Sequence, residues 1–313
     1  MKKTMMKGLS AAVVAGMIML ASCNKSNDNP LSVTDTQNVN SESVSASQSN
    51  EASDLTNSVM DNVTDTQLAQ ARMEWTIDLS GKDGRLKGAT ITINGTGTKD
   101  DPTGTITIDF GSGTTGADGI TRSGQIVITY SGKRFQEGST RSISFNNYSR
   151  NKISLTGTIL VTVTSVDSTT TVGTWVITHS HTTPQALTFT FADNSTATRT
   201  ATYTSVWTIV WTNLGQSTLT HKKGGTANGT TRKGASYNMS ITSDIVYSAA
   251  CVFTGYYFPQ SGAKTLSVTN AGSSSPNIYT FTFGSGSSTS CTNTVTIAYN
   301  GKTKTITISG DGN

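Results

Sequence analysis

Residues 105–110 read Thr-Ile-Thr-Ile-Asp-Phe, and this alternation of apolar and polar side chains decides the fold class. A period of two places Ile106, Ile108 and Phe110 on one face of an extended strand and the polar side chains on the other. One apolar and one polar face per strand is typical of antiparallel sheets that bury a single face. We therefore predict an all-β fold of antiparallel strands, arranged as a meander or as sandwich-like sheets. The same pattern recurs at 126–130, 159–163, 187–191, 203–211, 279–283 and 295–299.

Composition and turn chemistry agree with this prediction. The chain of 313 residues contains 57 Thr, 30 Gly and only 5 Pro, and 13% of its residues are charged. Abundant Thr favours strands and argues against helical bundles and coiled coils. In residues 295–308 the strand VTIAY is followed by Asn300-Gly301 and then by KTKTITI. Asn-Gly pairs favour the tight turns of hairpins, so we expect meanders rather than strand–helix–strand units.

A partial internal repeat predicts two related modules. Residues 118–124 read DGITRSG and residues 228–234 read NGTTRKG, and each stretch leads into an alternating strand. The tetrapeptide FGSG also occurs twice, at 110–113 and 283–286. A split near 181–186, where HTTPQA interrupts the strands, would place Gly119 and Gly229 in equivalent left-handed turns. The alternative is that Thr- and Gly-rich hairpins resemble one another by composition alone.

The N-terminus reads as an export signal. Lys2, Lys3 and Lys7 precede a short apolar stretch, which ends in Leu-Ala-Ser-Cys at residues 20–23. This ending resembles the lipobox of bacterial lipoproteins. The resemblance implies that residues 1–22 are a signal peptide and that Cys23 carries acyl chains such as palmitate. It also implies anchoring at the outer membrane, either surface-exposed or facing the periplasm.

Three further segments follow the signal. Residues 23–50 contain the lipidated Cys and then a stretch rich in Ser, Asn and Asp without an aromatic residue, which predicts a disordered tether. Residues 51–72 carry Leu55, Val59 and Val63 on one helical face, so we expect a short helix that begins near Ser53. Residues 73–313 form the β-rich region.

Charge is distributed unevenly along the chain. Residues 24–74 hold eight acidic and two basic residues, a net charge of −6, whereas residues 75–313 hold eighteen basic and eleven acidic residues, a net charge of +7. Loss of three lysines with the signal lowers the net charge from +4 to +1, so we expect no nucleic-acid partner. Basic pairs near predicted turns suggest an anionic glycan as a partner. The alternative is that they are solvated residues protecting sheet edges. These pairs are Lys133-Arg134, Lys222-Lys223 and Arg232-Lys233.

The β-rich region also resembles a group of uncharacterised exported lipoproteins. The features that carry the resemblance are TITIDFG at 105–111, the DGITRSG turn, and a late Cys followed by an alternating terminal hairpin. It covers most of residues 75–313. Because no activity can be assigned to that group, the resemblance implies none for this chain.

Cysteine and histidine are the residues with the clearest chemistry. Cys251 and Cys291 remain after lipidation, and in an exported protein this pair predicts a disulfide, with two buried thiols as the alternative. His179 and His181 lie two residues apart on a predicted strand and so share a face. They are weak candidates for a metal site, since a third ligand would have to come from His221 or a carboxylate. We therefore expect no cofactor.

Other site candidates are sparse. Tyr203, Trp207 and Trp211 share a strand face, where they either stack on sugar rings or belong to the core. A polysaccharide hydrolase needs two well-placed carboxylates, and no nucleophile motif is present. The available carboxylates of the β-rich region include Asp100, Asp101, Asp109, Asp118 and Glu137.

We therefore expect a lipid-anchored cell-envelope protein with a non-enzymatic binding or structural role and no catalytic residues. Two alternatives stay open. One is a hydrolase that acts on polysaccharide. The other is an adhesin or fimbrial-type subunit that assembles through sheet edges. The sequence does not indicate an oligomeric state.

Overall fold

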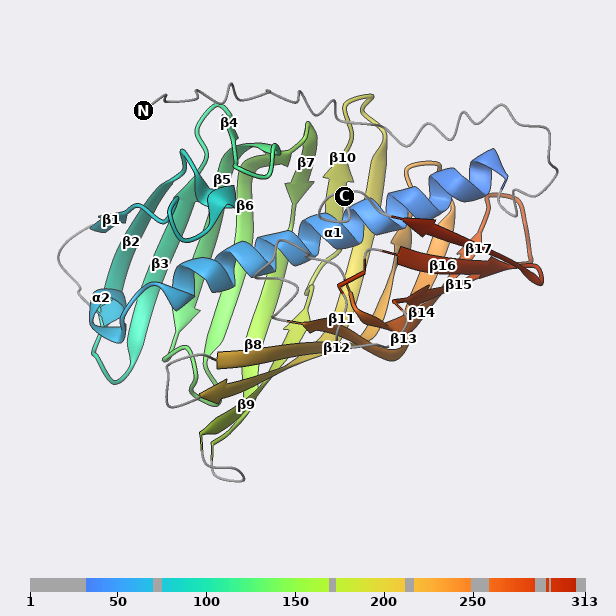
Figure 1. The fold of residues 1–313 in the computed structure, drawn as a ribbon. Helices are drawn as coiled ribbons and strands as arrows, with labels where there is room; N and C mark the ends of the chain where they lie inside the picture. The colour runs from blue at the N-terminus through green and yellow to red at the C-terminus, as the bar shows by residue number, and fades with distance from the viewer. Residues whose placement is uncertain are drawn as a thin grey trace, which may run out of the picture.

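The computed structural model describes residues 32–69, 75–168, 173–211, 217–248, 259–284, 291–292 and 294–307. One antiparallel sheet of 17 strands curves around a single long helix, α1 (Val33–Asp61), which lies across its concave face (Figure 1). The prediction of an antiparallel, meandering all-β fold is confirmed. The layer that packs against the sheet is this helix rather than a second sheet.

Strands that pair in the sheet lie close together in the sequence, and many of them pair with the strand directly before or after them. In the middle of the sheet, both strands of one hairpin are interrupted, the first at Gly157 and the second at residues 183–186. The segments before and after each interruption stay paired with the flanking strands. The sheet therefore continues through the predicted split at 181–186. The strands are β1 Trp75–Ile77, β2 Thr90–Gly97, β3 Pro102–Asp109, β4 Thr114–Thr115, β5 Thr121–Ser131, β6 Thr140–Arg150, β7 Ile153–Thr156, β8 Thr158–Asp167, β9 Thr174–Thr182, β10 Leu187–Thr190, β11 Thr196–Trp211, β12 Ser217–Thr230, β13 Ser236–Ser248, β14 Ser261–Thr269, β15 Asn277–Phe283, β16 Thr294–Tyr299 and β17 Lys302–Thr307.

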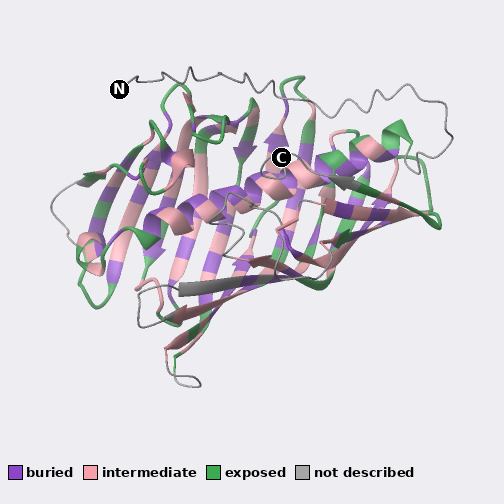
Figure 2. Ribbon diagram, viewed as in Figure 1, coloured by how far each residue is buried: buried purple, intermediate pink, exposed green. Residues whose placement is uncertain are grey.

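The apolar face of most strands points toward α1, as the alternating pattern predicted. Figure 2 shows buried and less buried residues in alternation along most strands. Ile106 and Ile108 of β3 and Ile126 and Ile128 of β5 are fully buried, whereas the Thr and Ser residues between such positions face outward. The core forms two clusters along α1. One includes Leu55 of the helix, and the other includes Val39 together with residues of β11–β16.

The predicted disordered tether is wrong over most of its length, because residues 33–50 belong to α1. The predicted helix at 51–72 is observed as the end of α1, which begins far ahead of Ser53 and ends at Asp61, and as a second short helix at residues 65–69. The start of α1 is fixed by Ser32, whose side chain accepts a hydrogen bond from the backbone N–H of Asp35, while the Asp35 carboxylate accepts one from the N–H of Ser32. Residues 1–31, including the predicted signal peptide and Cys23, lie outside the described residues.

The buried face of α1 escapes sequence analysis because it is polar. A stripe of serines at four-residue spacing faces the sheet, and each hydroxyl donates to the carbonyl one turn earlier: Ser45 to Ser41 at 2.9 Å, Ser49 to Ser45 at 2.9 Å and Ser53 to Ser49 at 3.3 Å. These hydroxyls are therefore satisfied within the helix and can be buried without water. Since such residues are weak helix formers, packing against the sheet must stabilise α1.

A second, short helix covers one edge of the sheet. In α2 (Asp65–Ala69), Leu68 is buried, and its carbonyl accepts a hydrogen bond from the Tyr130 hydroxyl at 2.6 Å. Gly95 of β2 lies directly beneath, where a Cβ atom would approach the Leu68 carbonyl oxygen to 2.2 Å. At the opposite edge, β17 carries Lys302 and Lys304, which discourage pairing with another strand. A single 3₁₀ turn, η1 (Gly84–Leu86), precedes β2.

The proposed repeat is only partly reproduced. Gly119 occupies a left-handed turn with φ 75°, but Gly229 lies within β12, and the corresponding left-handed residue is Gly234 with φ 78°. The predicted equivalence of Gly119 and Gly229 is therefore wrong. The second echo is matched in the backbone, because Gly111, two residues after the end of β3, has φ 59° and Gly284, directly after β15, has φ 58°.

The two glycines of the rejected equivalence should respond differently to the same substitution. Gly229→Ala should lower the free energy of unfolding by about 3 kcal/mol, because its Cβ would lie 2.0 Å from the Thr198 carbonyl oxygen inside the sheet. Gly119→Ala should lower it by only about 1–2 kcal/mol, through left-handed strain in open space. Urea denaturation measures both, and equal losses would contradict the placement of Gly229 within β12.

Candidate functional site

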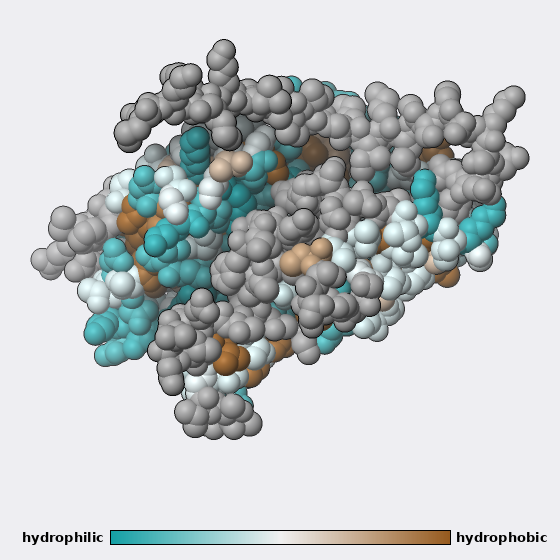
Figure 3. Space-filling model, viewed as in Figure 1, coloured by the Kyte–Doolittle hydropathy of each residue, from teal (hydrophilic) through white to brown (hydrophobic). Residues whose placement is uncertain are grey.

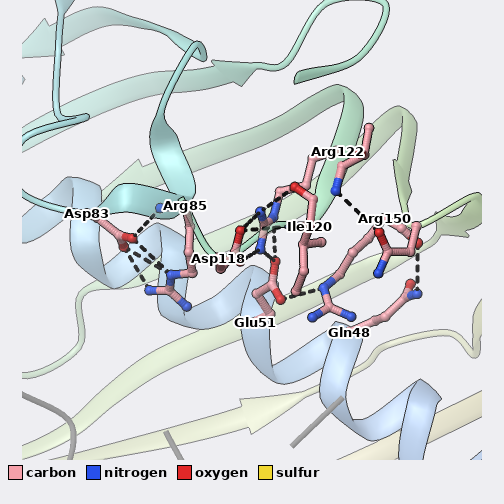
Figure 4. Close-up of polar contacts among 10 residues, drawn as sticks. Gln48, Glu51, Asp83, Arg85, Asp118, Ile120, Arg122 and Arg150 are labelled. Carbon is pink, nitrogen blue, oxygen red and sulfur yellow. Dashed lines mark hydrogen bonds and ion pairs between the residues drawn. The ribbon is translucent and has the colours of Figure 1, made fainter. Parts of the chain in front are cut away.

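The most concentrated chemistry lies beneath α1, where buried carboxylates of the helix meet cations of the sheet. Glu51 is bound on one side by Arg122 of β5 at 2.6 Å and on the other by Arg150 of β6 at 2.5 Å (Figure 4). Arg122, only 1% exposed, also contacts Asp118 at 2.6 Å. The Gln48 amide donates to the Arg150 carbonyl oxygen at 3.4 Å and joins the same network.

A second node repeats this arrangement farther along the helix. The two oxygens of Glu42 contact Arg199 of β11 at 3.0 Å and Lys264 of β14 at 2.8 Å. Burial alone would raise the pKa of the Glu42 carboxyl, but Lys264 and Arg199 outweigh burial and hold that pKa below its usual value. Glu42 is therefore ionised in a place that excludes water.

Both ends of α1 are fastened in the same way. At its start, Asp35 accepts hydrogen bonds from the Tyr279 hydroxyl and, at 3.0 Å, from the Asn277 amide of β15. At its end, Asp61 forms an ion pair with Arg134, and Asn57 accepts a hydrogen bond from Arg141 at 2.8 Å. The negative segment and the positive sheet are thus partners within one chain. The opposite charges of 24–74 and 75–313 were the sequence signal for this contact.

The basic pairs have mixed surroundings. Lys133 contacts Asp100 at 3.0 Å on the surface, while Arg134 turns toward α1. Lys223 is buried, and Lys233 is exposed. The side chain of Lys222 lies outside the described residues.

Arg232 lies beside the helix, and its side chain packs against residues that follow β10. Its guanidinium binds Asp193 at 2.5 Å and lies 4.3 Å from the centre of the Phe191 ring. Its backbone N–H donates to the hydroxyl of Ser41 at 3.0 Å. The hairpin that carries Arg232 therefore helps to hold α1 in place.

The chain's three histidines gather on the concave face, all of them buried. His179 and His181 share a face of β9 as predicted, and His221 lies on β12. His181 stacks on Tyr203 with ring centres 4.4 Å apart, and His221 stacks on Trp207 at 3.8 Å. Among the described residues, no three His, Cys, Asp or Glu side chains are arranged to hold a metal ion.

The surroundings of the histidines keep them neutral. Burial lowers the pKa of His179 to about 3, and the nearby Arg141 and Arg134 lower it further. Burial also lowers the pKa of His181 and of His221 well below the usual value, and the positive charge of Lys223 lowers both further. Protonating these rings inside the folded protein would place positive charge beside positive charge in a buried site.

The predicted cysteine and tryptophan sites are described only in part. Cys291 is disulfide-bonded, whereas Cys251 and Cys23 lie outside the described residues, so the pairing of Cys251 with Cys291 stays a prediction. Trp207 is half-buried against His221, which favours its assignment to the interior. The side chain of Trp211 lies outside the described residues.

The convex face carries a shallow hollow of about 370 Å³, which sequence analysis did not anticipate. Asp109, a candidate carboxylate, lies in it with Gln125 and Asn146 of the adjacent strands. A smaller hollow of about 210 Å³ lies beside α1 at Arg232 and Phe191. The other candidate carboxylates lie elsewhere: Asp100 binds Lys133, Asp118 binds Arg122, and Asp101 and Glu137 are exposed.

Comparisons with known proteins add no assignment. No family model, no curated protein and no solved structure matches the chain. Within the described residues, no helix has the length and apolar character needed to cross a membrane.

Replacing a buried carboxylate of α1 should be costly. Glu51→Gln removes the charge of the buried carboxylate that Arg122 and Arg150 share, and the free energy of unfolding should fall by about 3–5 kcal/mol. Asp100→Asn is the control, because Asp100 is 92% exposed beside Lys133 and its replacement should lower the free energy of unfolding far less than Glu51→Gln does. Guanidinium denaturation compares the two, and similar losses would contradict a clamping role for Glu51.

Stability should also fall as the solution becomes mildly acidic. A histidine whose pKa is lowered by folding binds fewer protons folded than unfolded, so its contribution is complete above about pH 6.5 and is lost as pH falls below that value. Each histidine should remove up to about 1.4 kcal/mol per pH unit. Urea denaturation at several values between pH 7 and pH 5 measures the slope.

A histidine variant identifies the source of that slope. His179→Gln should reduce the slope by about one third, since one of three buried rings no longer titrates. Asp61 contributes to the pH dependence of stability with the opposite sign, because burial raises the pKa of its carboxyl group. A free energy of unfolding that does not change between pH 7 and pH 5 would contradict the burial of neutral histidines.

Proposed function

We propose that this chain is a lipid-anchored protein of the bacterial outer membrane with a non-enzymatic binding or structural role. The observation that carries the proposal is the occupation of the concave groove by the chain's own helix. Glu42 and Glu51 bind the sheet cations that line the groove, and the serine stripe of α1 packs against the sheet. A surface closed in this way is suited to a scaffold rather than to a substrate cleft.

The position of α1 supports a body held close to the membrane. Only residues 24–31 separate Cys23 from the helix cap at Ser32. Eight residues and their flanking bonds span at most about 30 Å when fully extended. An acyl chain contributes about 0.8 kcal/mol per buried CH₂ group, so several chains on Cys23 would hold the protein stably at the bilayer.

The outer surface supports contact with polar envelope material. On the face seen in Figure 3, most of the described surface is hydrophilic or neutral, and the hydrophobic residues form small separate patches. The convex side of the sheet presents the outward-facing Thr and Ser of successive strands. Since Arg122, Arg150 and Arg199 are directed inward to α1, the net charge of +7 gives little support to an anionic glycan.

The alternatives have less to support them. A polysaccharide hydrolase needs two carboxylates in one cleft, and Asp109 is the single carboxylate among the residues that line the described outer hollow. A fimbrial-type subunit needs an edge strand that accepts another chain, and Lys302 and Lys304 on β17 oppose such pairing.

The anchor assignment is tested by replacing the lipidated residue. Cells that express the natural chain should incorporate labelled palmitate into it, and the protein should fractionate with the outer membrane. Cys23→Ala should abolish the label and leave an unprocessed signal peptide, because the acylated sulfur is missing. Cys291→Ser serves as the matched control and should keep the label.

Protease treatment of intact cells then distinguishes a surface-exposed body from one that faces the periplasm. Labelled palmitate in the Cys23→Ala variant, or a natural chain that stays soluble after cell lysis, would contradict the proposal. Purified protein that releases sugars from polysaccharide, with the activity lost in Asp109→Asn, would contradict the non-enzymatic role.

A further inference from the structure

The hollow on the convex face combines an unusual set of side chains for that surface. It is lined by Asp109 at the end of β3, Gln125 of β5 and Asn146 of β6, which we call the amide hollow. Asp109 lies opposite Gln125, and Gln125 lies opposite Asn146, in the register of the sheet. The surrounding outward positions carry mainly the short side chains of Thr and Ser. Three long planar polar groups therefore stand side by side.

Hydrogen bonds hold these groups in one direction. The Asn147 amide donates to Asn146 at 3.4 Å, Asn146 donates to Gln125 at 3.0 Å, and Gln125 donates to the Asp109 carboxylate at 2.8 Å. The other oxygen of Asp109 accepts the backbone N–H of Gly111 at 2.7 Å. Side chains ordered before a ligand arrives lose less conformational entropy on binding.

The backbone beneath keeps the space open. Gly124 has φ 71°, and a Cβ atom there would approach the Asn147 carbonyl oxygen to 2.2 Å. Asn147 itself has φ 50°, and the register of β5 and β6 shifts between Ser123 and Gln125. This bulge turns the backbone away from the regular pleat beside the three side chains.

We propose that the amide hollow binds a neutral carbohydrate through its hydroxyl groups. After the internal hydrogen bonds are counted, Gln125 and Asn146 each keep one free N–H donor, and the Asp109 carboxylate keeps lone pairs on both oxygens. Hydroxyl groups both donate and accept, so adjacent hydroxyls of one sugar can satisfy donors and the acceptor together. Two strand spacings, about 9–10 Å, match the length of a disaccharide.

Other ligand classes fit less well. An anionic ligand would meet the Asp109 carboxylate without a cation among the lining residues. A metal ion lacks ligands, since no group of three His, Cys, Asp or Glu in the described part of the chain can hold one. An apolar ligand finds no aromatic or aliphatic side chain in the lining. The inference rests on the proposed non-enzymatic envelope role and names its ligand class.

The experiment measures the retention of the full mature chain on soluble neutral polysaccharides. Dextran, mannan, xylan and β-glucan are each cast into native gels, with heparin as an anionic arm. At least one neutral polymer should retard the natural chain, and retention should be the same at low and high salt, because the contacts do not depend on net charge. Gln125→Ala and Asp109→Asn should each weaken retention at least tenfold.

Matched variants separate binding from folding. Thr129→Ala and Thr105→Ala lie on the same strands and the same outer face, and they should change retention less than twofold. All four variants should keep the melting temperature of the natural chain, which excludes unfolding as the cause of lost retention.

Three results would overturn the inference: no retention on any neutral polymer, retention that survives Gln125→Ala and Asp109→Asn, or retention on heparin alone. None of these results affects the palmitate labelling of Cys23, so the proposed lipid anchor is tested independently of the proposed ligand class. Loss of palmitate labelling with retention intact would instead remove the anchor and leave the binding site.

Discussion

The structure depends on the burial of two glutamates of one helix between basic side chains of one sheet. A buried carboxylate is stable only when paired, and Glu51 and Glu42 are each held by two cations from different strands. Helix and sheet depend on each other, because burying the basic side chains of the sheet would cost as much free energy without the glutamates of the helix. Such pairs add little net stability over an apolar core, but they strongly penalise any other position of α1 along the groove.

This constraint ties the beginning of the chain to its end. Glu42 binds Lys264 and Asp35 binds Tyr279, across sequence separations of 222 and 244 residues. Val39 of the helix also belongs to the core cluster of the C-terminal strands. Hairpins form from residues that are close in sequence, whereas these contacts need nearly the whole chain. The helix can therefore dock in its final position only after β14 and β15 have formed. A segment that emerges first during synthesis is thus placed last, next to the anchoring Cys23 that we propose.

The parts of the fold that follow from local periodicity could be predicted from sequence. The alternation at Ile106 and Ile108 predicted which faces are buried, and Asn300-Gly301 predicted a hairpin whose residues have φ 49° and 72°. Residues 33–50 could not be recognised, because their helical stripe consists of residues that elsewhere mark disorder. The amide hollow was equally hidden, since it brings Asp109 and Asn146 together through register and a bulge.

The charge distribution that suggested an anionic partner also has an explanation within the fold. Cations gathered in residues 75–313 suggest an anionic partner when sequence is counted alone. In the folded chain the helix supplies that anion, and Arg122, Arg150 and Arg199 are covered by it. What the convex face offers is hydroxyls and a row of ordered amides beside one carboxylate. A ligand that binds this surface replaces its hydrogen bonds to water with hydrogen bonds to the protein and gains little from charge attraction. Its affinity therefore has to come from side chains that are ordered before binding and from repeated binding units along a polymer.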